Sequence, residues 1–316
     1  MKKRTTASDV AKLSGVSTIT VSRYINCPHK LALNTKARIQ EAIETLNYHP
    51  NLVAKAMNEG RTNSIYLRIP NDIPATNPFY LHLVSGVAEE LGMQGFSLLM
   101  GRKSYDNSQS VDGLIYTGAV KEEIREIQKL AKKMPIVLFG NIAGVASIDV
   151  DNYYGEYNAT KKTVQNRDQS IIYISIDQDR DFIKERERGF FAAMREINSE
   201  NYVVYKCQNN NSVAYDLAIA NMKIFSQAYA IICASDDIAI GVGNALASYV
   251  PSVLKRIKLA GFDGLGVEKN MIPNIMTVRQ PIFEIGQMLA KRIIEMVKNQ
   301  TSDTCLELVK PEFVES

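Results

Sequence analysis

Apolar positions in the first sixty residues follow a helical period that a glycine interrupts. The pattern runs through Val10 and Leu13, breaks at Ser14-Gly15, and resumes after Ser17, whose hydroxyl can cap a second helix. The positions of this second helix that face inward are Val16, Thr20, Val21 and Tyr24. The pattern therefore predicts two short helices joined by a tight turn, which is the size of a helix-turn-helix.

The helical period continues in residues 35–46 and returns briefly after Pro50. Asn34-Thr35 stands where a helix cap is expected, and the apolar stripe of this third helix ends at about Leu46. Residues 52–58 form a further helical stretch that Gly60 ends. Seven residues cannot sustain a helix alone in water, because nucleation is costly. We therefore expect residues 52–58 to be helical only when a partner supports them.

From Ser64 onward, short apolar runs alternate with amphipathic helical segments. Such alternation predicts parallel sheets covered by helices, and its two runs indicate two similar lobes. The predicted strands are 65–69, 96–100, 111–116 and 136–139, then 171–176, 202–206, 230–233 and 259–262, and the predicted helices are 80–93, 122–133, 154–165, 183–197, 213–225, 239–249 and 282–298. Ligands of such folds bind at the carboxyl ends of the strands.

The outer face of the predicted second helix carries residue types that contact DNA bases. Thr18, Ile19, Ser22 and Arg23 occupy this face, which a helix-turn-helix inserts into the major groove. Arginine can bind guanine, isoleucine can contact a thymine methyl group, and hydroxyls can bond bases or phosphate. A helical hairpin with a solvated polar face would explain any one of these residues, but the turn, the cap and the outer face agree on DNA binding.

Charge is distributed unevenly along the chain. Residues 1–61 hold ten Lys or Arg and four acids, a net charge of +6, whereas the remainder has a net charge of −3. A module that neutralises phosphates needs such a local excess, and a uniformly solvated surface does not. The basic end of the chain is therefore the end that we expect to bind DNA.

Composition limits the class of protein and its location. The 316 residues are 46% hydrophobic and 22% charged, as in a globular protein with sizeable cores. No apolar run approaches the roughly 20 residues of a membrane span, and Met-Lys-Lys-Arg leads into polar residues. We expect a cytoplasmic protein with no membrane partner. The four scattered cysteines and three histidines predict reduced thiols and no metal site.

Motifs of catalysis and of cofactor binding are incomplete. Asp177-Gln-Asp-Arg-Asp181 begins like a calcium loop, but Phe182 and Arg188 replace its glycine and its final glutamate. Gly241-Val-Gly243 lacks the third glycine of a dinucleotide fingerprint, and no Walker loop or G-x-S-x-G occurs. The sequence predicts a protein without a cofactor and not an enzyme.

Several short motifs, taken in order, are similar to those of the lactose/galactose repressor (LacI/GalR) family of transcriptional repressors. They are Asp9-Val-Ala-Lys-Leu-Ser-Gly-Val-Ser17 with Thr20-Val-Ser-Arg23, Asn47-Tyr48, Pro50-Asn51 with Ala54, Asn77-Pro-Phe79, Val111-Asp-Gly113, Ala234-Ser-Asp236, Gly261-Phe-Asp-Gly264 and Thr277-Val-Arg-Gln-Pro281. Any one tetrapeptide would be weak, but together they cover nearly the whole chain. The resemblance implies an all-α helix-turn-helix DNA-binding domain and an α/β periplasmic-binding-protein-like domain with two parallel-sheet lobes.

The resemblance further implies that a homodimer binds a pseudo-palindromic double-stranded operator. In the family, paired hinge helices insert an apolar side chain, usually leucine, into the minor groove. Residues 52–57 match this hinge, and an ordinary surface linker is the alternative. Met57 stands at the inserted position, and Ala54 would let the paired helices approach. The implied DNA-binding residues are Thr6, Ser17, Thr18, Ile19, Ser22, Arg23, Asn26, Asn51, Ala54 and Met57.

The same resemblance implies that the two lobes close on a small effector, commonly a sugar or a sugar phosphate. Asp263 and Arg186 match effector-binding positions, and a carboxylate with a guanidinium suits a hydroxyl-rich ligand. The alternatives are a strand-end turn aspartate for Asp263 and a solvated residue for Arg186, which lies in a charged run. Further candidates are Asn77, Phe79, Asn141, Ser235, Asp236 and Gln280.

One segment departs from the family pattern. Only residues 101–110 separate the second predicted strand from the third, where the family has a full crossover helix. Ten polar residues with no apolar stripe cannot cover a sheet face. Either this face of the first lobe is open, or another element covers it.

We therefore expect a DNA-binding domain at residues 1–50, a hinge at 51–62 and an effector-binding and dimerisation domain at 63–316. Lobe 1 would comprise about 63–153 and 279–300, and lobe 2 about 154–278 and 301–316. The predicted function is an effector-controlled transcriptional regulator, and specifically a repressor, of carbohydrate genes. The alternatives are a regulator that needs no effector, a sugar-binding protein, and an enzyme of similar α/β build.

Overall fold

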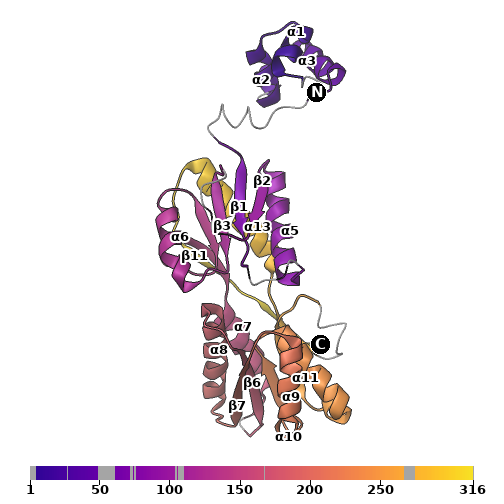
Figure 1. The fold of residues 1–316 in the computed structure, drawn as a ribbon, viewed down its shortest axis with the longest axis vertical. Coiled ribbons are helices and arrows are strands. Elements are labelled where there is room, and N and C mark those ends of the chain that lie inside the picture. The colour runs from indigo at the N-terminus through magenta and orange to yellow at the C-terminus, as the bar shows by residue number, and fades with distance from the viewer. Residues whose placement is uncertain are drawn as a thin grey trace. The chain divides into compact units, whose positions relative to one another are not determined.

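The computed structural model divides into two compact units, Met1–Asn63 and Ser64–Ser316 (Figure 1). It describes residues 5–26, 28–48, 61–71, 74, 76–103, 105, 110–166, 168–266 and 275–315. Each unit has a hydrophobic core of its own. Within the described residues, no helix combines the length and the apolar character that a membrane span needs.

The first unit is a small helical domain built on the predicted helix-turn-helix. Its described elements are α1 (Ala7–Ser14), α2 (Thr18–Asn26), the 3₁₀ helix η1 (Pro28–Lys30) and α3 (Leu33–Thr45). Val10, Val21 and Ile39, one from each α-helix, are fully buried. The predicted cap of the third helix is wrong: α3 begins at Leu33, after Ala32, so the two residues expected as its cap lie inside its first turn.

The second unit contains two six-stranded sheets, one in each lobe. The sheet of lobe 1 has the order β11-β5-β4-β3-β1-β2, and that of lobe 2 has the order β12-β10-β9-β8-β6-β7. All pairs are parallel except β10 with β12. The strands are β1 (Ser64–Arg68), β2 (Ser97–Gly101), β3 (Gly113–Thr117), β4 (Ile136–Phe139), β5 (Ala146–Val150), β6 (Ile171–Ile176), β7 (Tyr202–Cys207), β8 (Ala230–Cys233), β9 (Lys258–Asp263), β10 (Ile275–Arg279), β11 (Leu306–Val309) and β12 (Glu312–Val314).

Helices cover both sheets, as the alternating pattern predicts. In lobe 1, α5 (Pro78–Met93) and α13 (Ile282–Asn299) pack closely together, and Gly86 and Gly286 permit this because a Cβ at either would strike the backbone of the other helix. The 3₁₀ helix η2 (Lys121–Glu123) and α6 (Ile124–Ala131) follow β3. Lobe 2 contains α7 (Asn152–Thr163), α8 (Asp181–Ile197), α9 (Asn211–Ala220), α10 (Met222–Phe225), α11 (Asp236–Tyr249) and η3 (Pro251–Lys255).

Tyrosine side chains cover the part of lobe 1 where the crossover helix is missing. A right-handed connection from β2 to β3 must pass over the face opposite α5, and Tyr66 and Tyr116 are buried on that face. Tyr105 lies against Tyr66 with ring centroids 5.8 Å apart, and the Tyr66 hydroxyl donates to the Lys103 carbonyl at 3.0 Å. Among the described residues between β2 and β3 there is no helix. This face is therefore covered, not open.

The chain crosses between the lobes three times, which corrects the expected lobe boundaries. The crossings follow β5, β10 and β11. The assignment of residues 301–316 to lobe 2 is wrong in part, because β11 pairs with β5 in the sheet of lobe 1. Sequence patterns missed β11 because it is a short edge strand whose Leu306 and Leu308 are exposed.

A stripe of polar side chains lies inside lobe 2 along α7. Asn152, Glu156, Thr160 and Thr163 recur at helical spacing and are each at most 4% exposed. Oε1 of Glu156 has no hydrogen-bond partner, and neither does the hydroxyl of buried Tyr173 on β6. Burial raises the pKa of Glu156 to about 8, while the positive charge of Arg186 opposes the rise. Glu156 is therefore mainly protonated at neutral pH.

We predict that Glu156 makes the protein less stable as the pH rises. Its pKa is higher in the folded chain than in the unfolded one, so the folded state holds an extra proton between about pH 4.5 and about pH 8. The free energy of unfolding should therefore fall by up to about 1.4 kcal/mol per pH unit in this window. Glu156→Gln should flatten this slope in denaturant titrations across the window. The exposed Glu126→Gln is the matched control and should keep the wild-type slope.

Candidate functional site

The outer face of α2 presents the four residues that the sequence pattern selects. Thr18, Ile19, Ser22 and Arg23 are exposed, whereas Val21 is fully buried. Ile19 is 70% exposed, so its aliphatic side chain is available for an apolar contact outside the domain. The helix therefore combines apolar, hydroxyl and guanidinium groups on one face, the set that reads base edges in a major groove.

The turn that presents α2 is fixed by one glycine and one arginine. Gly15 has a positive φ of 66°, and its N–H bonds the Ala11 carbonyl to end α1. Arg38 from α3 donates to the carbonyls of Ser14 and Gly15. The Ser17 hydroxyl then accepts from the Thr20 amide at 3.1 Å, which confirms its position as the cap of α2.

The remaining DNA-binding candidates lie at the helix ends or in the hinge. Thr6 caps α1, and its hydroxyl donates to the Asp9 carboxylate at 2.7 Å. Asn26 is the last residue of α2. The hinge candidates Asn51, Ala54 and Met57 lie outside the described residues.

Lobe 2 buries an arginine close to the ends of several strands. Arg186 on α8 is 4% exposed, so the alternative interpretation as a solvated residue does not hold. Its Nε donates to Asn152 Oδ1 at 2.9 Å, and its Nη1 donates to the Ala234 carbonyl. The guanidinium also stacks on Phe262, with Cζ 3.6 Å from the ring centroid. Three kinds of contact therefore hold this cation in one orientation.

Asp263 faces this arginine from the end of β9. Its Oδ1 lies 3.7 Å from Arg186 Nη1 and accepts a 2.7 Å hydrogen bond from Gln280 Nε2. Burial raises the pKa of Asp263 to about 6, while Arg186 opposes this rise. Its backbone has a φ of 127°, a region that non-glycine residues rarely occupy. The strained backbone aims a partly exposed carboxylate beside a fixed guanidinium.

Asp236 and Ser235 support this site from the start of α11. Asp236 accepts from the Gly264 amide and from the Thr277 hydroxyl, both at 2.7 Å, so its carboxylate ties β9, β10 and α11 together. The Ser235 hydroxyl caps α11 and contacts Asn209. Asp236 is therefore placed to hold the turn that contains Asp263.

The candidates from lobe 1 form a separate group. Asn77 caps α5 by accepting from the Phe79 amide at 3.0 Å. Phe79 packs against Phe139, the last residue of β4, with ring centroids 5.7 Å apart. Asn141 is exposed beyond β4. The structure thus brings together Arg186, Ser235, Asp236, Asp263 and Gln280 in lobe 2 and Asn77 with Phe79 in lobe 1.

Sequence reasoning missed the residues that orient Arg186 and Asp236. Asn152, Phe262 and Thr277 make these contacts. Asn152 begins α7 two residues after the end of β5, a strand that the apolar pattern did not reveal. Had that strand been recognised, its polar carboxyl end would have marked Asn152 as a site residue.

The arrangement favours recognition of a polar, hydroxyl-bearing molecule. A carboxylate accepts hydrogen bonds from hydroxyls, and a guanidinium donates them in a fixed fork. Among the described residues, no group of three or more His, Cys, Asp or Glu side chains could hold a metal ion. The cysteines on β7 and β8 are buried, and burial raises the pKa of Cys207 to about 11, which makes its thiol a poor nucleophile.

Family models match the chain in two adjacent stretches. Residues 6–51 match the model of "Bacterial regulatory proteins, lacI family". Residues 64–309 match "Periplasmic binding proteins and sugar binding domain of LacI family". The two matches correspond to the helical unit and to the two-lobed unit.

Individual relatives and solved structures agree with these matches. The chain is 31% identical to the HTH-type transcriptional regulator YvdE of Bacillus subtilis, over 98% of both chains. Its fold is similar to that of a lac repressor dimer bound to operator and an anti-inducer, with a TM-score of 0.82, 19% identity and coverage of 99% of this chain and 98% of the other. It is also similar to a complex of the regulator CelR with cellobiose, with a TM-score of 0.71, 23% identity and 99% coverage of both. The chain therefore belongs to the lacI family of bacterial regulatory proteins, and it is a transcriptional regulator and not an enzyme.

Proposed function

We propose that this regulator is a cytoplasmic, homodimeric repressor whose affinity for a pseudo-palindromic operator responds to a small sugar. The observation that carries the effector part of this proposal is the buried Arg186 held beside Asp263. We further propose that residues 1–50 bind DNA, 51–62 form the hinge, and 63–316 bind the effector and dimerise. Within 63–316, the pairing of β11 with β5 and of β12 with β10 supports a division of the last residues between the two lobes.

Operator recognition is assigned to α2 and the hinge. Thr18, Ile19, Ser22 and Arg23 would contact base edges, and Ser17 and Thr6 would contact the backbone near the helix N-termini. Asn26, Asn51, Ala54 and Met57 keep the roles that the family resemblance implies. The net charge of +6 on residues 1–61 supports binding to phosphates.

Dimerisation is assigned to the edges of the two sheets at β2 and β7. Both are edge strands, whose outer backbone N–H and C=O groups can pair with a strand of another chain. Met100 on β2 and Met93 on α5 are more than half exposed, and Val203 on β7 is 45% exposed. Exposed apolar side chains beside an open strand edge favour a contact with a second copy of the chain.

A sugar effector is assigned to the site around Arg186 and Asp263. The solved complex of CelR with cellobiose and the family model of a sugar-binding domain support this chemistry. Gln280, Ser235 and Asp236 would complete the lobe 2 side, while Asn77, Phe79 and Asn141 would contribute from lobe 1. Thermal shifts measured with sugars and with sugar phosphates distinguish a free sugar from a phosphorylated one.

We predict that Arg23→Ala reduces discrimination between operators more than it reduces binding to all DNA. Loss of a bidentate contact to guanine should cost about 1 to 3 kcal/mol of selectivity. Sites should first be selected from random duplex DNA at a stated salt concentration, and affinities of both proteins then compared on the best site and on single-base variants. Lys12→Ala is a control for charge alone. Equal weakening on every sequence would assign Arg23 to a phosphate instead.

We predict that Asp263→Asn keeps operator affinity but loses the response to the effector. Asparagine has the shape of aspartate and keeps an oxygen that can accept from Gln280 Nε2, so the turn should persist. Losing charge-assisted hydrogen bonds should weaken ligand binding by about tenfold or more. Thermal shifts across a panel of sugars and sugar phosphates would identify the ligand, with the exposed Asp216→Asn as control. A panel in which wild-type protein shows no shift would favour a regulator without an effector.

A further inference from the structure

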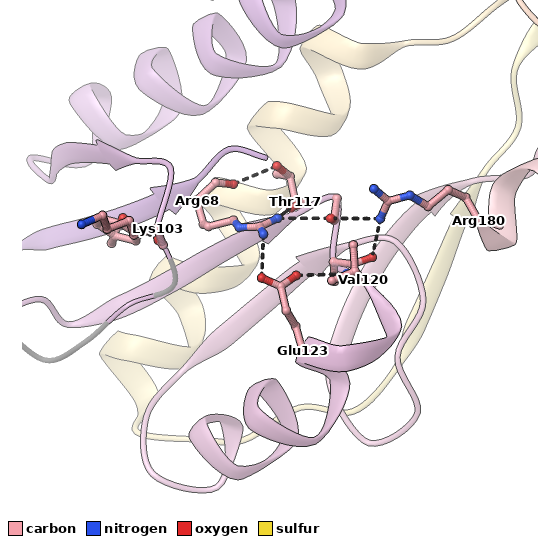
Figure 2. A network of polar contacts seen from close by, with 9 residues as sticks. Arg68, Lys103, Thr117, Val120, Glu123 and Arg180 are labelled. Carbon is pink, nitrogen blue, oxygen red and sulfur yellow. Dashed lines mark hydrogen bonds and ion pairs between the residues drawn. The ribbon is translucent and has the colours of Figure 1, made fainter. Parts of the chain in front are cut away.

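Residues 117–123, which we call the β3–α6 segment, accept hydrogen bonds from arginines of both lobes. Arg68 at the end of β1 donates to the Thr117 carbonyl at 2.7 Å and to the Gly118 carbonyl at 3.1 Å. Arg180, directly before α8 in lobe 2, donates to the Ala119 carbonyl at 3.2 Å and approaches the Gly118 carbonyl at 3.5 Å. Figure 2 shows the two guanidinium groups reaching the segment from opposite sides.

Arg68 makes the β3–α6 segment a rigid part of lobe 1. It is 6% exposed, and its Nη2 forms a 2.6 Å ion pair with Glu123. The other oxygen of Glu123 accepts from the Val120 amide at 3.0 Å, and the Thr117 hydroxyl donates to the Arg68 carbonyl at 2.8 Å. The two terminal nitrogens of Arg68 therefore bond different acceptors, and a buried arginine with several acceptors is held more firmly than one in an exposed ion pair.

Arg68 lies on the face of lobe 1 over which the connection from β2 to β3 must pass. Side chains alternate along β1, so Arg68 lies on the same face as Tyr66, the face over which a crossover helix would pass. Here the guanidinium lies over Tyr116, with Cζ 5.4 Å from the ring centroid. An aliphatic side chain suits a strand under a covering helix, whereas an arginine can occupy this face once that helix is absent.

A second charged residue of lobe 2, Asp179, contacts Lys121 of the same segment. Lys121 lies 2.5 Å from Asp179 Oδ2, and Lys184 of lobe 2 lies 2.6 Å from Asp179 Oδ1. Hydrogen bonds from Lys121 and Lys184 lower the pKa of Asp179 to about 2, so it stays charged at any physiological pH. Lys121 and Asp179 are both more than half exposed, so their attraction is screened by salt.

We propose that Asp179 and Arg180 of lobe 2 form a reversible latch with the β3–α6 segment of lobe 1, and that Arg68 is the positioning residue that makes this segment a firm support. The buried Arg68 holds the β3–α6 segment in lobe 1, whereas the ion pair between Lys121 of this segment and Asp179 of lobe 2 is exposed and weak. Each exposed ionic contact shifts an equilibrium by at most about fivefold, so the lobes can separate. This proposal concerns the two lobes alone and does not rest on the effector or the operator.

Amide hydrogen exchange of the full-length protein tests the latch. Asp179→Asn and Arg180→Gln change lobe 2 only, yet each should make peptides covering 117–123 exchange about two- to fivefold faster. Lys121→Gln should do the same. The double variant Lys121→Gln with Asp179→Asn should be no faster than either single variant, because the two side chains act as one pair.

Two controls separate the latch from general loss of stability. Lys161→Gln removes an ion pair with Glu196 inside lobe 2 and should leave peptides 117–123 unchanged. Raising the salt concentration to about 1 M should accelerate amide exchange of these peptides in the wild type but not in the double variant. Salt weakens the exposed ion pair in the wild type while every residue of the buried network stays in place. Unchanged exchange in Asp179→Asn and Arg180→Gln, or additive effects of Lys121→Gln and Asp179→Asn, would overturn the proposal, as would insensitivity of the wild type to salt.

Discussion

Three short crossings of the chain between the lobes constrain the rest of the two-lobed unit. Lobe 1 takes its sheet and its covering helices from segments that are far apart in the sequence, and lobe 2 takes its edge strand β12 from residues 312–314. The core and the sheet of lobe 1 include α13 and β11 from the C-terminal part of the chain. Ile285, Leu289 and Ile293 of α13 are fully buried. Lobe 1 therefore cannot bury its core from one continuous stretch, whereas the main core of lobe 2 comes from residues 164–275. Many contacts join distant residues, and such a topology slows folding because loop closure precedes the gain from packing.

Local features of the sequence were sufficient for the DNA-facing domain but only partly for the ligand site. The helix-turn-helix could be predicted because Gly15, Ser17 and the apolar period all act within a few residues. The positions of Arg186 and Asp263 came from family resemblance, and no local pattern distinguished a buried Arg186 from a solvated one. Its burial depends on Asn152 and Phe262, which only the folded sheet brings near it.

Other errors have the same physical origin. The strand β5 and the edge strand β11 are short, and their pairing depends on each other, so neither has a strong periodic signal alone. The sequence also left open whether the face without a crossover helix was covered. Tyr105, in the connection between β2 and β3, packs against Tyr66 on this face, a contact between residues that no helical or strand period relates.

Lobe 2 maintains several unfavourable features around one site. Arg186 and Glu156 are buried charged-residue types, and Asp263 adopts a strained backbone. Such departures from local preference are common where a protein binds or switches, because the surrounding fold supplies the stability. The aliphatic core around β6 and β8, in which Ile174 and Ile231 are fully buried, provides that support.

The place of β1 in its sheet has a mechanical consequence. This strand comes directly after residues 61–63 in the chain, and it pairs with β2 on one side and β3 on the other. A pulling force along the chain from the N-terminal side would enter lobe 1 through an inner strand. Two parallel ladders of backbone hydrogen bonds would then share the load in shear, whereas an edge strand would offer only one. Lobe 1 is thus attached to the preceding chain at a point that resists peeling.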